Sequence, residues 1–167
     1  MINRPSRYAC LMLAALLPCW SAAQTPKPAV AADGAAQWKA ECASCHMPYP
    51  AGLLPQRSWQ KLMAGLDKHF GADASLGAAD ATRITAYLVK NSAEQHTSRR
   101  SAKFLQSIAP GETPLRISDT PHFVKEHRKV TAETWKLPKV GGKANCNACH
   151  SDAESGEFSD RNTKIPQ

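Results

Sequence analysis

Two copies of the pattern C-x-x-C-H constrain this chain more than any other feature. They occupy residues 42–46 and 146–150. The pattern is the attachment signature of a c-type haem: two thiols three positions apart form thioethers with the haem vinyl groups, and the following His ligates the iron. A single C-x-x-C would also suit a redox-active dithiol or half of a zinc site. Two complete copies favour two covalently bound haem c groups.

The residues predicted to carry these haems follow directly from the motifs. The predicted thioether positions are Cys42, Cys45, Cys146 and Cys149. The predicted iron ligands on the motif side are His46 and His150.

Residues 1–23 are typical of a secretory signal peptide. Arg4 and Arg7 supply the positive start, residues 8–17 are apolar, and small residues precede a cleavage site after Ala23. The apolar run is too short for a hydrocarbon core of about 30 Å. We therefore expect export to the periplasm and a mature form without a transmembrane segment.

Cleavage at that site would remove Cys10 and Cys19 and leave only the motif cysteines. No cysteine would then remain for a structural disulfide, in a compartment where free thiols tend to pair. Removal of Arg4 and Arg7 lowers the formal net charge from +7 to +5. This balance favours steering toward an acidic redox partner over nucleic-acid binding, although solubility alone explains it equally well.

The remaining sequence predicts a small, all-α, loop-rich fold with two haem-centred halves, residues 24–97 and 98–167. No strand pattern is convincing. We expect a helix after the cap Asp33, a second from the cap Ser58 to a stop at Gly71, and a third over residues 78–90. Shorter helices are expected over residues 101–107, after Thr120-Pro121 and over residues 131–137.

The sequence offers two candidates for the second ligand of the first iron. On a helix, Trp59, Leu62 and His69 fall on one apolar face, and His69 follows the first motif, so we expect His69 to be the ligand. Met63 is the alternative, but it lies away from His69 on such a helix, and filling a gap in the core is its more common role.

The second half has no methionine, so its second ligand is expected to be a histidine. His127 comes one turn after Phe123, whose ring can then pack beside the porphyrin, and it is the preferred candidate. His122 and His96 are the alternatives. His127 precedes its motif whereas His69 follows its own, so the halves are not copies of one domain.

These features resemble the small dihaem cytochromes c of bacteria, over nearly the whole mature chain. The resemblance rests on residues 41–46, 52–55, 58–59, 67–71, 99–101, 113–117, 120–127 and 145–150, and on the ending at residues 156–166.

The resemblance implies a cytochrome c-like fold and a periplasmic electron carrier, not an enzyme. Each of the two haems would have two histidine ligands, the distal ones being His69 and His127. The implied partners are redox proteins, among them a membrane b-type cytochrome or a small monohaem cytochrome c. The alternative is a haem enzyme or gas-binding protein, in which one iron has an open or displaceable axial position.

Overall fold

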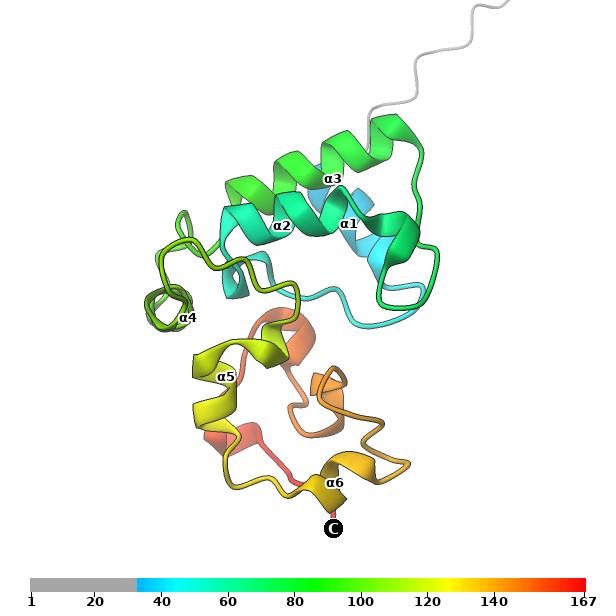
Figure 1. Ribbon diagram of the computed structural model, residues 1–167. Coiled ribbons are helices and arrows are strands. Elements are labelled where there is room, and N and C mark those ends of the chain that lie inside the picture. Colours follow the sequence, from blue (N-terminus) through cyan, green and yellow to red (C-terminus); the bar gives the residue numbers. More distant parts are fainter. Residues whose placement is uncertain (1–32) are drawn as a thin grey trace, which may run out of the picture. The chain divides into compact units, whose positions relative to one another are not determined.

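The computed structural model describes residues 33–167, which are helical and contain two isolated β-bridges (Figure 1). The predicted all-α class is confirmed. The predicted signal peptide and the cleavage site after Ala23 lie outside the described residues. The α-helices, which alternate with short 3-10 turns, are α1 (Gly34–Cys42), α2 (Gln56–Met63), α3 (Ala78–Lys90), α4 (Arg99–Ser107), α5 (Pro121–Glu126) and α6 (Ala132–Lys136).

Helices α1 and α2 both pack on α3 (Figure 1). The inward face of α3 presents Ile84 and Leu88, which are almost completely buried, as the periodicity predicted. With Ala51, Leu54 and Trp59 they form the first hydrophobic cluster. The Trp59 indole N–H donates to the Ala51 carbonyl oxygen at 2.7 Å, so this buried polar group is satisfied.

A second hydrophobic cluster lies where α4 and α5 meet. It consists of Leu53, Phe104 and Phe123. Leu53 comes from the first predicted half, and Ile117 packs against both clusters. The two predicted halves therefore share part of their core, and the described residues belong to one compact unit.

Two helices begin at the predicted capping residues. Asp33 caps α1, and Thr120 caps α5 with Pro121 as its first residue. Thr131, the first residue of the expected segment 131–137, caps α6, although no cap was predicted there. Helix α4 begins at Arg99, two residues before the predicted start, because the Ser98 side chain accepts a hydrogen bond from the backbone N–H of Ser101.

The prediction for α2 was wrong at both ends. The helix begins at Gln56, and Ser58 is a completely buried residue inside it instead of its cap. The Glu94 carboxylate accepts a hydrogen bond from the Gln56 backbone N–H at 2.9 Å and satisfies a free donor of the first turn. The helix ends at Met63, shortly before Gly65, a residue type that weakens helices.

His69 consequently does not share a helix face with Trp59. A separate 3-10 turn, Leu66–Lys68, precedes it, and Phe70 after it has a positive φ of 52°. Gly71 follows with φ 101°, a conformation that glycine adopts without a steric cost. The chain thus reverses around His69.

In residues 33–167 no helix has both the length and the apolar composition needed to cross a membrane.

Candidate functional site

Three of the four motif thiols lie in environments that disfavour redox-active dithiol chemistry. Cys42 is the last residue of α1, and burial raises the pKa of its thiol to about 11, with a smaller contribution from the Glu41 carboxylate. Burial also raises the pKa of the Cys146 and Cys149 thiols. Reactive cysteines have lowered pKa values, so these thiols do not resemble a catalytic pair.

The structure brings His46 and His69 together. Their ring centres lie 6.2 Å apart and the ring planes are inclined by 24°. Tyr49 stacks on His46 at 4.7 Å, and the Phe70 ring lies 4.8 Å from His69. An aromatic ring therefore lies beside each histidine of the pair.

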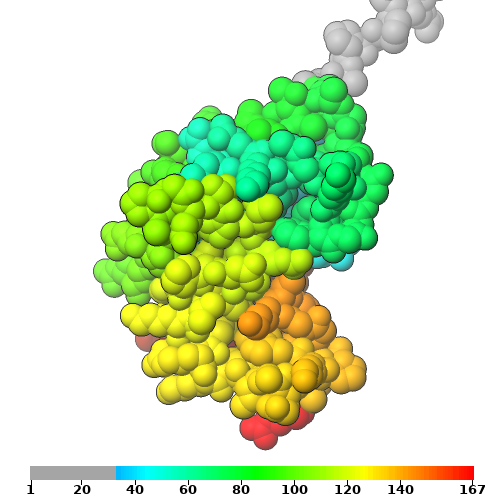
Figure 2. Space-filling model, viewed as in Figure 1, coloured from blue at the N-terminus to red at the C-terminus, as the bar shows by residue number. Residues whose placement is uncertain are grey.

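The structure also brings His127 and His150 together. Their ring centres lie 6.1 Å apart, but the planes are inclined by 80°. His127 follows directly after α5 and stacks on Phe123 at 3.9 Å, which is the aromatic contact expected from their spacing of one turn. In Figure 2 the yellow segment, which contains α5 and α6, lies against the orange segment, which contains the second motif.

Both ring separations fit two imidazoles on opposite sides of one metal ion. Two metal–nitrogen bonds of about 2.0 Å, each to a ring nitrogen roughly 1.1 Å from its ring centre, place the ring centres about 6 Å apart. Burial lowers the pKa of His69 and of His150, and the facing histidines, His46 and His127, lower it further. Neutral imidazole is the form that ligates metals.

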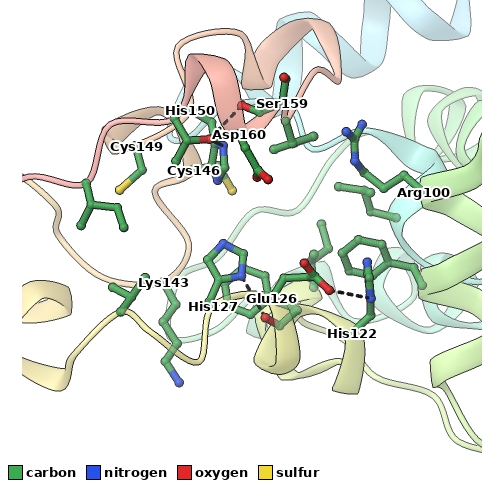
Figure 3. Close-up of a pocket in the computed structure, with 18 of the residues that line it drawn as sticks. Arg100, His122, Glu126, His127, Lys143, Cys146, Cys149, His150, Ser159 and Asp160 are labelled. Carbon is green, nitrogen blue, oxygen red and sulfur yellow. Dashed lines mark hydrogen bonds and ion pairs between the residues drawn. The ribbon is translucent and has the colours of Figure 1, made fainter.

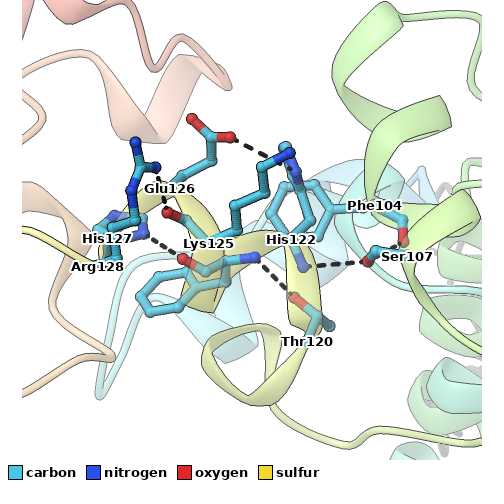
Figure 4. Close-up of polar contacts among 9 residues, drawn as sticks. Phe104, Ser107, Thr120, His122, Lys125, Glu126, His127 and Arg128 are labelled. Atoms are coloured by element: carbon cyan, nitrogen blue, oxygen red, sulfur yellow. Dashed lines mark hydrogen bonds and ion pairs between the residues drawn. The ribbon is translucent and has the colours of Figure 1, made fainter.

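Two of these rings are oriented by backbone carbonyl groups. His46 Nδ1 lies 2.6 Å from the Met47 carbonyl oxygen, and His127 Nδ1 lies 2.9 Å from that of Phe123 (Figure 4). A carbonyl oxygen only accepts, so Nδ1 must carry the proton in both rings. The Nε2 lone pair is then free for a metal, the usual arrangement for ligating histidines.

The second pair lines a cavity of about 590 Å³, within the size range of ligand and cofactor sites. His127 approaches it from α5, and Cys146 and His150 approach from the opposite side (Figure 3). Phe104, Phe123, Trp135 and Phe158 supply apolar lining. The basic lining residues are Arg99, Arg100, Lys103, Lys129 and Lys143. Two acidic residues, Glu126 and Asp160, also line the cavity, so basic side chains outnumber acidic ones. An apolar cavity with this excess of cationic side chains suits a flat hydrophobic group that carries carboxylates.

The alternative histidines lie in different settings. His122 lines the same cavity, but its ring packs edge-on against Phe104 and its Nδ1 lies 3.9 Å from the Glu126 carboxylate (Figure 4). His96 is exposed, and its Nδ1 accepts a hydrogen bond from the Ser98 backbone N–H. In neutral His96 the proton is therefore on Nε2, the nitrogen that a ligand would need free.

Met63 lies in the first hydrophobic cluster. It is partly buried there, as expected for a residue that fills a gap in the core.

Tyr49 is a functional candidate that the sequence analysis missed. Its ring stacks on His46, and its hydroxyl donates to the Ala144 carbonyl oxygen at 2.7 Å, just before the second motif. Burial is the main reason that the Tyr49 pKa rises to about 12, so the hydroxyl stays protonated at neutral pH. Tyr49 thus contacts both motif regions. Its position between two prolines after the first motif was the only available signal.

The chain as a whole is similar to a known protein family and to solved structures. A family model described as dihaem cytochrome c matches residues 38–158. A solved diheme cytochrome c from Rhodobacter sphaeroides is 44% identical, with 73% of this chain and 94% of that chain covered and a TM-score of 0.66. A diheme cytochrome c from Shewanella baltica OS155 is 34% identical, with 80% and 94% covered and a TM-score of 0.66. A comparison with curated protein sequences gave no match.

Proposed function

This chain belongs to the dihaem cytochrome c family, and we propose that it transfers single electrons between redox partners through two haems, each with two histidine ligands. Like the family, it carries two covalently bound haem c groups. We assign one haem to Cys42 and Cys45, and the other to Cys146 and Cys149. We further propose export to the periplasm, with the two haems in the halves 24–97 and 98–167.

The observation that carries the proposal is the pairing of four histidines. His46 faces His69 at 6.2 Å, and His127 faces His150 at 6.1 Å, each a separation that suits two ligands on one iron. These are the four histidines selected from the sequence, and neither His96 nor His122 takes part in such a pair.

The residues around each pair explain why electron transfer suits these sites. A haem iron supplies one-electron chemistry by alternating between its ferrous and ferric forms. Two histidine ligands on each iron would leave a substrate no place to bind on the metal. Tyr49 and Phe70 at the first site, and Phe123 and Trp135 at the second, add apolar rings beside the histidines.

Several charged groups are suited to hold the haem carboxylates and to face partners. Arg99, Lys103, Lys129 and Lys143 line the second cavity. Cations beside carboxylates form strong charge-assisted hydrogen bonds. Those that remain exposed would favour a redox partner with an acidic surface, such as a membrane b-type cytochrome or a small monohaem cytochrome c.

Spectroscopy of the purified, haem-loaded protein tests this proposal. We expect reversible one-electron reduction of both haems, low-spin spectra in both oxidation states and no carbon monoxide binding. Rapid and complete carbon monoxide binding would contradict the proposal and favour a gas-binding protein or haem enzyme. The intact mass should equal that of the chain from Gln24 plus two haems.

A further inference from the structure

The imidazole of His150 is oriented by a side chain, unlike those of His46 and His127. His150 Nδ1 lies 3.0 Å from the Thr163 hydroxyl oxygen. The same hydroxyl donates to the Ser159 carbonyl oxygen at 3.0 Å. Its single proton is therefore engaged, and the oxygen can only accept from His150. This arrangement puts the proton of neutral His150 on Nδ1 and leaves Nε2 free.

We propose that Thr163 is a positioning residue that sets the orientation and basicity of His150 and thereby lowers the potential of the second haem. The inference rests on the proposed function, because it requires His150 to ligate iron. An acceptor at Nδ1 makes an imidazole a more basic ligand. A more basic ligand stabilises the more highly charged ferric iron, and hydrogen bonding around ligands is a known lever on haem potentials.

The backbone around Thr163 holds its hydroxyl in place. The Lys164 backbone N–H donates to the Cys149 carbonyl oxygen at 2.9 Å, which ties the C-terminal segment to the second motif. Ser159 caps the 3-10 turn Asp160–Asn162. Thr163 itself pairs with His150 in an isolated β-bridge. The acceptor is thus fixed from both sides, as a positioning role requires.

Thr163 is also the place where a substitution can remove such an acceptor. The acceptors of His46 and His127 are main-chain carbonyl groups, which every residue type keeps. Replacing Thr163 by Val removes the hydroxyl and preserves the branched shape. The change should therefore act on one haem alone.

The test compares midpoint potentials of the haem-loaded protein with those of Thr163→Val, Thr163→Ser and Thr85→Val. Thr85 is the matched control, because its hydroxyl also donates to a carbonyl oxygen four residues earlier, that of Ala81, within α3. In Thr163→Val we expect one potential to rise, by a shift near tenfold in the reduction equilibrium, which is about 59 mV for one electron. Thr163→Ser and Thr85→Val should keep both wild-type potentials.

Either of two results would overturn the inference. One is that both midpoint potentials are unchanged in Thr163→Val, and the other is a shift in Thr163→Ser as large as in Thr163→Val. A measurement on the wild type makes the test independent of variant folding. The His150 Nδ1 proton should exchange slowly with solvent in nuclear magnetic resonance spectra, and rapid exchange would contradict the bond.

Failure of the proposed function would look different. A second iron that lacks two histidine ligands would give a high-spin signal or carbon monoxide binding in the wild type. An error about Thr163 alone would leave the wild type low-spin.

Discussion

The two histidine pairs are held by different kinds of structure. At the first site, His46 follows α1, and α1 and α2 pack on α3 around Ile84 and Leu88. At the second, His150 follows a 3-10 turn, Cys146–Ala148, and His127 follows the six-residue helix α5. Helices this short are not stable by themselves. The first site thus has a conventional core beside it, whereas the second depends more on the group that fills its cavity.

The hydrogen bonds that orient the histidine rings differ between the sites in the opposite sense. At the second site both histidines donate Nδ1–H, to Phe123 and to Thr163. At the first site His46 does so, but among residues 33–167 no hydrogen bond reaches a ring nitrogen of His69. His69 lies in the tight reversal before Phe70. The site with the larger apolar core therefore has the less constrained distal ligand.

The largest expected effect comes from removing one haem at a time. The double variant Cys146→Ala/Cys149→Ala should lose one haem from its intact mass. It should also lose amide hydrogen-exchange protection in α4, α5 and α6 by about tenfold or more. Helix α3 should keep its protection, because the residues that bury Ile84 and Leu88 are protein side chains.

The matched variant is Cys42→Ala/Cys45→Ala, which should lose the other haem and leave α4 and α5 protected. Equal loss of protection throughout the chain in both double variants would contradict the contrast between the sites.

The next effect concerns the distal ligands. His69→Ala and His127→Ala should each open one iron, with a high-spin component and carbon monoxide binding at one haem of two. His122→Ala and His96→Ala are the controls and should keep the wild-type spectrum. Absorption spectra of the ferrous proteins with and without carbon monoxide give the answer. An open iron in His122→Ala together with a closed one in His127→Ala would reverse the assignment.

Local signals in the sequence were sufficient for much of the fold. The caps at Asp33 and Thr120 and the bounds of α3 follow from short-range rules of capping and periodicity. The placement of His127 beside Phe123 is equally local, because it needs only one helical turn.

The errors arise where distant residues decide the structure. Ser58 resembled a cap, but Glu94 satisfies the start of α2 from 38 residues away. The apolar periodicity ran on through Leu66, although the helix ends before Gly65. His69 nevertheless faces His46, because the 3-10 turn and the reversal at Phe70 bring it back. The role of Thr163 depends on a contact across 13 residues that no motif marks.

A smaller effect is expected from Tyr49→Phe, which removes the hydrogen bond between the two motif regions and keeps the ring stacked on His46. The free energy of unfolding should fall by about 0.5–1.5 kcal/mol, with both haems retained. Guanidinium unfolding followed by circular dichroism measures the difference.

Tyr87→Phe is the control, because Tyr87 packs against Trp38 and its hydroxyl makes no hydrogen bond among the described residues. Its effect should stay within about 0.5 kcal/mol. Equal losses in the two variants would remove the basis for a link through Tyr49.

The finest difference between the sites is the angle between the imidazole planes. Each imidazole donates π density mainly to one iron d orbital. Two imidazole planes inclined by 24°, as at the first site, would both raise the energy of the same iron d orbital and so separate it in energy from the second d orbital of π symmetry. Planes inclined by 80°, as at the second site, would raise these two iron d orbitals almost equally. Two d orbitals of nearly equal energy give a much more anisotropic electron paramagnetic resonance signal.

Low-temperature electron paramagnetic resonance of the fully oxidised wild type is therefore the most direct test of two histidine-ligated haems. We predict two low-spin signals of equal intensity, one rhombic and one strongly anisotropic. The near-infrared absorption spectrum of the same sample should show no sulfur-to-iron band. A high-spin signal in the intact protein would contradict histidine ligation on both sides of each iron. A sulfur-to-iron band would contradict His69 and assign Met63 in its place.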